Sequence, residues 1–170
     1  MSGGTPSVTF HAGEGCEPSL DRSRLARDLS ALLAHFPRRV ARVDVQLVGD
    51  HAMAAAHKRF MDIDGTTDVM SFPAHDEADA SAAVEADLFI CTEVAAREAA
   101  ARGHSVEREI LLYAVHGALH ACGFRDDTEE SFRAIHAEED RILAAGGIGP
   151  VYASGHVSPD QASQVGGPRP

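Results

Sequence analysis

Residues 105–122 decide the fold of this chain, and their sequence is SVEREILLYAVHGALHAC. Apolar side chains recur along this segment with the spacing of one helical face, at Val106, Ile110, Ala114, Ala118 and Ala121. A second apolar stripe runs along another side of the same helix, at Leu111, Val115 and Leu119. A helix that is apolar on more than one side is packed by several neighbours. We therefore expect a central helix that ends at Gly123.

The chain on either side of this helix carries strand and helix patterns. Short apolar or alternating runs typical of strands lie at residues 8–11, 43–48, 68–73 and 87–91. Amphipathic patterns typical of helices cover residues 21–35, 50–62, 92–102 and 129–145, and Asp21, Asp50 and Thr92 are expected to cap the first three. The order of these elements predicts an α/β or α+β domain with one small sheet of about four strands and about five helices.

The length of 170 residues fits a single domain with a real core. We assign that domain to residues 1–152. Residues 153–170 are rich in Gly, Ser, Pro and Gln and are expected to form a disordered tail. The chain contains no apolar run long enough to cross a membrane, and its first residues lack the pattern of a signal peptide. We therefore expect a cytoplasmic protein that does not bind membranes.

The charge and cysteine content limit the classes of function. The formal net charge is -11, whereas proteins that bind nucleic acid by themselves are usually basic. A nucleic-acid role therefore requires a local basic patch, a bound cation or a protein partner. The three cysteines, Cys16, Cys91 and Cys122, are widely spaced and form no CxxC pair. Neither a disulfide framework nor a zinc knuckle is indicated.

The central helix carries a pattern of metal ligands. His116 and His120 are four residues apart and lie on one face of the helix, so both imidazoles can point at one ion. Gly123 ends the helix and allows the chain to return with Asp126. Two histidines and one carboxylate leave open coordination positions, as in catalytic zinc sites. We predict one ion per chain, most simply zinc, bound by His116, His120 and Asp126.

The alternative is that two helical histidines at this spacing occur by chance. Against this, histidines in an apolar helix need polar partners, which the glycine break and the following carboxylates supply. The zincin proteases place a glutamate directly after the first histidine as general base, and here that position is Gly117. Peptide hydrolysis by that route is therefore not expected.

Three segments together resemble the YbeY family of bacterial rRNA maturation factors. Residues 116–126, HGALHACGFRD, resemble the family signature HGxLHLxGYxH. Residues 67–73, TDVMSFP, and residues 86–91, ADLFIC, are similar to its T(D/N)VLSFP and GDIVIC strands. The resemblance anchors roughly residues 40 to 145 and implies the α+β class, with a single mixed sheet and a metal cleft beside the central helix.

This chain departs from the family pattern at three positions. Asp126 replaces the commoner third histidine, and Phe124 replaces a tyrosine. Met61 stands where the family usually has an arginine thought to meet RNA phosphate. Lys58 or Arg59, from the adjacent turn, are the candidates to replace that arginine.

The resemblance implies a metal-dependent single-strand endoribonuclease that acts in rRNA maturation and ribosome quality control. Its partners would be ribosomal RNA and the small ribosomal subunit, and its catalytic residues would include His116 and His120. Ser71, near the end of its strand, is a third candidate catalytic residue that could orient phosphate or water, and the alternative is a plain strand serine. Asp127 is a candidate to hydrogen-bond and support a ligand histidine without binding the ion, or else a solvated turn residue. Two other functions stay open. One is a ribosome-assembly factor with a structural metal, and the other is metal-assisted hydrolysis of a small molecule or peptide.

Overall fold

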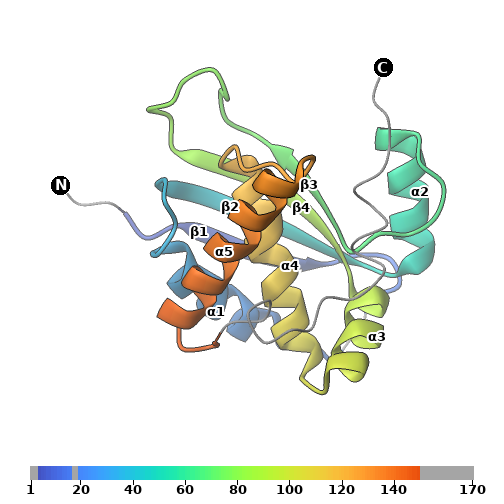
Figure 1. The fold of residues 1–170 in the computed structure, drawn as a ribbon. Coiled ribbons are helices and arrows are strands. Elements are labelled where there is room, and N and C mark those ends of the chain that lie inside the picture. The colour runs from blue at the N-terminus through green and yellow to red at the C-terminus, as the bar shows by residue number, and fades with distance from the viewer. Residues whose placement is uncertain (1–3, 17–18, 150–170) are drawn as a thin grey trace.

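The computed structural model describes residues 4–16 and 19–149, which form one sheet with helices on both of its faces (Figure 1). The expected domain boundary at residue 152 and the tail at residues 153–170 lie outside the described residues. The elements follow in the order β1 (Ser7–Ala12), α1 (Arg22–Leu33), β2 (Val40–Val48), α2 (Asp50–Met61), β3 (Val69–Pro73), β4 (Val84–Cys91), α3 (Thr92–Arg102), α4 (Val106–Ala121) and α5 (Glu129–Ala145). Among these residues no helix is long and apolar enough to cross a membrane.

The four strands form one mixed sheet in the order β1-β2-β4-β3. Strands β1, β2 and β4 are parallel, and β3 lies antiparallel along the edge of β4. The expectation of a single mixed sheet with five helices in an α+β domain is confirmed. Because β3 is the edge strand nearest to α4, its residues reach the part of that helix that carries the candidate ligands.

Helix α4 is the centre of the core, as its two apolar stripes predict. It packs on β3 and β4, and its other sides contact α1, α3 and α5 (Figure 1). Its residues from Glu109 to Val115 are all buried. Alternation along the strands sends a second set of side chains to the opposite face of the sheet. There α2 covers a smaller apolar cluster formed by Val48, Met53, Met70 and Cys91.

The expected helix caps are partly wrong. Asp21 caps α1, and its side chain accepts a hydrogen bond from the backbone N–H of Arg24 at 3.0 Å. Asp50 does not cap α2, because its carboxylate is held by Arg97 and the N-cap residue is Gly49. Thr92 does not cap α3 either, because its hydroxyl donates to the carbonyl of Val48 at 3.2 Å. In both cases a contact with another element replaces the local cap.

Candidate metal centre

The C-terminal half of α4 carries His116 and His120 on one face. The two side chains are one helical turn apart, and their Nε2 atoms lie 3.0 Å from each other. Both side chains are partly accessible, with exposures of 18% and 28%, although most of the helix is buried. The helix therefore presents two imidazole nitrogens to one point at the surface of the core.

A glycine turn at the end of α4 brings the third candidate ligand back to this point. The N–H of Gly123 donates to the carbonyl of His120 and the N–H of Phe124 donates to that of Leu119, which is the Schellman arrangement. Gly123 has a φ of 103°, a conformation that side-chain-bearing residues rarely adopt. The chain then returns, and Asp126 Oδ2 lies 3.4 Å from His120 Nε2 and 3.8 Å from His116 Nε2.

The outer nitrogens of both histidines have their own partners. Nδ1 of His120 lies 3.0 Å from the carbonyl oxygen of Phe124, and Nδ1 of His116 contacts Glu139 Oε1. A carbonyl can only accept, so Nδ1 of His120 is assigned as the donor and its Nε2 carries the lone pair. The same assignment at His116 turns its Nε2 lone pair toward the same point. Acceptors that fix the outer nitrogen of a ligand histidine are typical of metal centres.

The spacing of the three donor atoms fits a zinc-type ion. With metal–ligand distances of 2.0–2.1 Å, two ligands of a tetrahedral site lie about 3.3 Å apart. The separations of 3.0, 3.4 and 3.8 Å between His116, His120 and Asp126 bracket this value. Two facing lone pairs also repel each other unless a proton or a cation lies between them. The donor set and its spacing therefore fit a divalent ion with open coordination positions.

A buried carboxylate from α5 supports this centre. Glu139 is fully buried and contacts His116 through Oε1 and His136 Nδ1 through Oε2, the latter at 2.8 Å. The ring of His136 is stacked on that of His116, with 5.7 Å between the ring centroids. His116, His136 and Glu139 are themselves close enough to form a second group of potential ligands. Because Glu139 bonds to Nδ1 of His116 and to Nδ1 of His136, it fixes the orientation of the His116 ring.

Electrostatics couple these groups. Burial by itself lowers the pKa of His116, but the charge and hydrogen bond of Glu139 outweigh it and raise that pKa to about 9. Burial raises the pKa of Glu139, but its contacts with His116 and His136 hold that pKa below its ordinary value. The hydrogen bond with His120 is the main reason that the pKa of Asp126 is lowered. In the absence of an ion, a proton on His116 therefore occupies the centre.

Two other residues singled out in the sequence have different surroundings. The hydroxyl of Ser71, on β3, donates to the backbone carbonyl of Gly117 at 2.7 Å. It therefore ties the edge strand to α4 between the two histidines. Asp127 is half-exposed and pairs with Arg125 at 2.9 Å. The carboxylate bonded to a candidate ligand histidine is thus Glu139, which sequence reasoning missed.

Among the described residues, the two candidates to replace the family arginine near Met61 already have neighbours of their own. Met61 is 46% exposed at the end of α2, beside the exposed Phe60. Lys58 is held by two carboxylates, at 2.8 Å from Asp62 and 3.5 Å from Asp64. The guanidinium of Arg59 lies over the ring of Phe60, 5.4 Å from its centroid. The sequence hypothesis about Lys58 and Arg59 stays a prediction, although Lys58 already has partners.

Comparison with known proteins matches most of this chain to one family. The model of the family described as Endoribonuclease YbeY matches residues 18–147. Among curated relatives, proteins named Endoribonuclease YbeY from Mycobacterium ulcerans and Mycobacterium marinum are each 37% identical over 111 residues. These alignments cover 61% of this chain and 62% of each relative, so the matched part spans about three fifths of the relatives' length. A solution structure of a Thermotoga maritima protein is 20% identical, with a TM-score of 0.49 over 89% of this chain and 97% of that protein.

Proposed function

The chain belongs to the YbeY endoribonuclease family, and from this premise we propose that it is a metal-dependent single-strand endoribonuclease. Its role would lie in rRNA maturation and ribosome quality control. Its substrate would be ribosomal RNA, and its docking partner the small ribosomal subunit. The observation that carries the proposal is the convergence of His116, His120 and Asp126 on one point, with the outer nitrogens of both histidines already bonded.

Each residue of the centre would have a separate role. His116 and His120 would hold one zinc ion through Nε2, and Asp126 would add a negative charge to the ligand set. Such an ion supplies Lewis acidity toward a phosphoryl oxygen and lowers the pKa of water toward neutrality. Glu139 keeps the Nδ1 proton on His116, which preserves the tautomer that can bind.

We propose that the main role of Ser71 is to hold the edge strand β3 in place against α4. Its hydrogen bond to the carbonyl of Gly117 fixes β3 against the helix at the residue between the two ligand histidines. The edge strand then forms one wall beside the centre, along which an RNA strand would lie. A direct contact of Ser71 with phosphate or water stays a prediction.

A non-catalytic ribosome-assembly factor is the second candidate function. It is favoured by the surface at Met61, where an exposed methionine replaces a phosphate-binding arginine and Lys58 is neutralised by Asp62 and Asp64. In that case the ion would hold the end of α4 and the loop after Gly123 together without cutting RNA.

The test compares cleavage of a labelled single-stranded rRNA fragment by the parent and by three variants, with metal content measured for each. Asp126→Asn removes the ligand charge and should lose most metal and activity. Asp126→His restores the usual family ligand and should keep both. Asp127→Asn is the matched control, because Asp127 is adjacent in sequence but pairs with Arg125.

The same proteins are sedimented with small ribosomal subunits. A parent that shows no metal-dependent cleavage, while it and all variants bind subunits equally, would refute the hydrolase proposal in favour of the assembly factor.

A further inference from the structure

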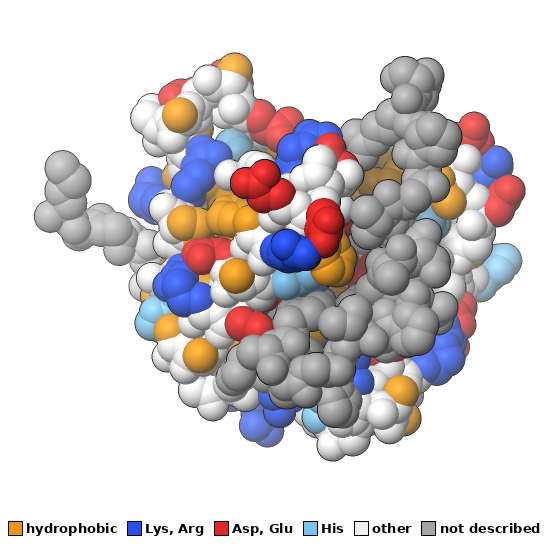
Figure 2. Space-filling view, in the orientation of Figure 1, with side chains coloured by type: hydrophobic (Ala, Val, Ile, Leu, Met, Phe, Trp, Pro, Cys, Tyr) orange, Lys and Arg blue, Asp and Glu red, His pale blue; other side chains and the backbone are white. Residues whose placement is uncertain are grey.

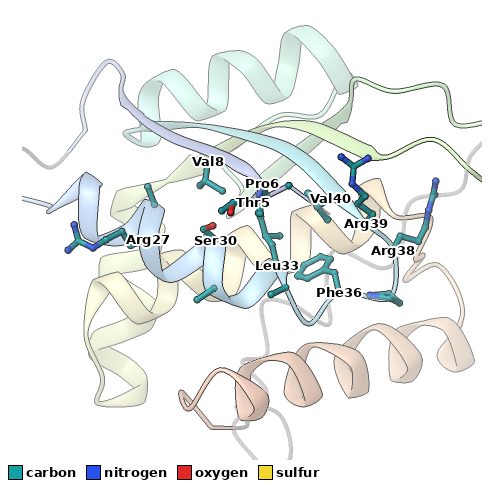
Figure 3. Close-up of a pocket in the computed structure, with 15 residues that line it drawn as sticks. Thr5, Pro6, Val8, Arg27, Ser30, Leu33, Phe36, Arg38, Arg39 and Val40 are labelled. Atoms are coloured by element: carbon teal, nitrogen blue, oxygen red, sulfur yellow. The ribbon is translucent and has the colours of Figure 1, made fainter. Parts of the chain in front are cut away.

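A second concave site lies away from the metal centre, between the start of β1, the C-terminal half of α1 and the turn into β2 (Figure 3). Its volume is about 860 Å³, within the range of ligand pockets. The ring of Phe36 and aliphatic side chains such as Leu33 form its apolar lining. Thr5 and Ser30 also line the pocket and bring two hydroxyl groups to it (Figure 3).

The charge of this pocket is the opposite of that of the whole molecule. Arg27 stands at one end and Arg38 and Arg39 at the other, and no Asp or Glu lines it (Figure 3). In Figure 2, Lys and Arg side chains lie beside the loop between β3 and β4, with Asp and Glu side chains close to them. Most other cations of the described residues are already paired with carboxylates, namely Arg24, Arg42, Lys58, Arg97, Arg102, Arg125, Arg133 and Arg141.

Among the described residues, the three pocket arginines form no hydrogen bond to a carboxylate. Within the described part of the chain, the side chains of Arg27 and Arg39 have neither a hydrogen bond nor an ion pair. Arg38 donates to two backbone carbonyls, those of Ala82 at 3.1 Å and Cys122 at 3.4 Å, and to no carboxylate. In a protein with a net charge of -11, the pocket thus has three guanidinium groups with no carboxylate hydrogen-bond partner among the described residues, although the charge of Arg38 also acts on Asp79.

We propose that this pocket binds one nucleotide of the RNA strand, outside the linkage that is cut. The proposal rests on RNA being the substrate of the proposed function. A base would lie against the Phe36 ring and the apolar lining, since stacking on aromatic side chains is how proteins hold single-stranded bases. Thr5 and Ser30 would bond to its sugar or base edge. The guanidinium groups at both ends would meet the phosphates on either side.

The position of Arg38 links this pocket to the metal centre. The carbonyl of Cys122, to which it donates, belongs to the residue that ends α4, two residues after His120. The same guanidinium holds the loop between β3 and β4 through Ala82. One strand that crosses the end of α4 would therefore contact both the pocket and the centre, and the pocket would set where along the strand the centre acts.

The test measures binding of a fluorescein-labelled single-stranded rRNA fragment to the full chain in EDTA, where no metal-dependent cleavage occurs. The pocket variant is Arg27→Glu with Arg39→Glu, because both residues are exposed and their side chains form no hydrogen bond or ion pair within the described residues. The control is Arg24→Glu with Arg133→Glu, which makes the same charge change at side chains that are 71% and 74% exposed outside the pocket. Adenosine monophosphate is titrated as a separate ligand, and small ribosomal subunits are sedimented with each protein.

The pocket variant should bind the fragment roughly tenfold more weakly or worse, while the control stays within about threefold. The slope of log affinity against log salt should fall by about 1.4, because two single-strand phosphate contacts at roughly 0.7 each are lost. These results would support the proposal whether or not the parent cleaves RNA when metal is restored, so a failed hydrolase test is distinguishable from a failed pocket test.

Three outcomes overturn the proposal. Equal losses of RNA affinity in the pocket and control variants would mean that the affinity depends only on the total charge of the protein. Saturable binding of adenosine monophosphate without any change in RNA affinity would assign the pocket to a free nucleotide. Unchanged RNA affinity together with lost subunit binding would assign this surface to a ribosomal protein.

Discussion

Replacing Glu139 by glutamine tests whether this buried carboxylate controls the metal centre. Glutamine has nearly the same shape, but only one of its two terminal atoms can accept a hydrogen bond. In the parent both carboxylate oxygens are used, one by His116 and one by His136. The variant therefore removes the charge and leaves one histidine facing an amide N–H. Losses of this kind at outer partners of metal ligands reduce metal affinity by about 10- to 100-fold.

A second effect acts in the opposite direction at neutral pH. The parent must release the proton on His116, whose pKa is raised to about 9, before the ion can bind. At pH 7.5 this competition lowers the zinc affinity of the parent by roughly 30-fold, since the pKa of His116 lies about 1.5 units above the pH. Without Glu139 the effect of burial dominates and the proton is lost at lower pH. The parent and Glu139→Gln should thus bind zinc with similar affinity near pH 7.5. Above pH 9, Glu139→Gln should bind zinc about 10- to 100-fold more weakly than the parent.

The assay is a zinc titration against a competing chelator between pH 6.5 and 9.5, with cobalt absorption as an independent report of the ligand geometry. The control is Glu138→Gln, on the same helix, whose carboxylate bonds to Arg141 instead. The parent and this control should gain about one decade of apparent affinity per pH unit up to pH 9, and Glu139→Gln should gain much less. If the Glu139 variant follows the slope of the parent over this whole range, Glu139 does not hold the proton and our account of the centre is wrong.

Three further predictions concern the same centre. The pKa of His116 is higher in the folded protein than in the unfolded chain, so protonation of His116 stabilises the metal-free protein. This contribution to the free energy of unfolding should be complete below pH 6.5, and on the order of 3 kcal/mol should be lost as the pH rises through about 9. Urea unfolding at pH 6 and at pH 9 checks the sign of this change. Gly117→Ala should destabilise the protein by about 1 kcal/mol, since its Cβ would lie 3.0 Å from Leu88 and Val69, and a raised thermal midpoint would contradict this close packing. Ser71→Ala should cost about 1 kcal/mol of stability and leave zinc affinity unchanged, with cleavage reduced less than tenfold; a loss of roughly a hundredfold or more in cleavage alone would instead show direct contact with the substrate.

The candidate ligands could be predicted from the sequence because their geometry is local. His116 and His120 share one helical face by spacing alone, and Gly123 supplies the positive φ that turns the chain back toward them. Everything needed to bring Asp126 to the same point therefore lies within residues 116–126. The two apolar stripes likewise predict the central position of α4, because a helix can bury both stripes only between several neighbours.

Glu139 could not be placed because its role depends on how α5 packs on α4. A signal was nevertheless present in the sequence. Ile135, Ile142 and Leu143 define the buried stripe of α5, and Glu139 lies within it at helical spacing. A glutamate on the apolar face of a helix must find a partner when it is buried. The wrong caps at Asp50 and Thr92 have the same origin, since Arg97 and the carbonyl of Val48 lie far away in sequence.

The net charge of -11 is a weak argument against an RNA substrate once the charges are located. Exposed charges act over about 10 Å at 0.1 M salt, so a strand responds to the groups along its own path. Some of the carboxylates are paired with a cation within the protein, as Asp50 is with Arg97 and Glu138 with Arg141. The three arginines at the pocket are not neutralised in this way, and a divalent ion would reverse the charge at Asp126. The net charge of the whole molecule therefore does not decide the charge along one path past the end of α4.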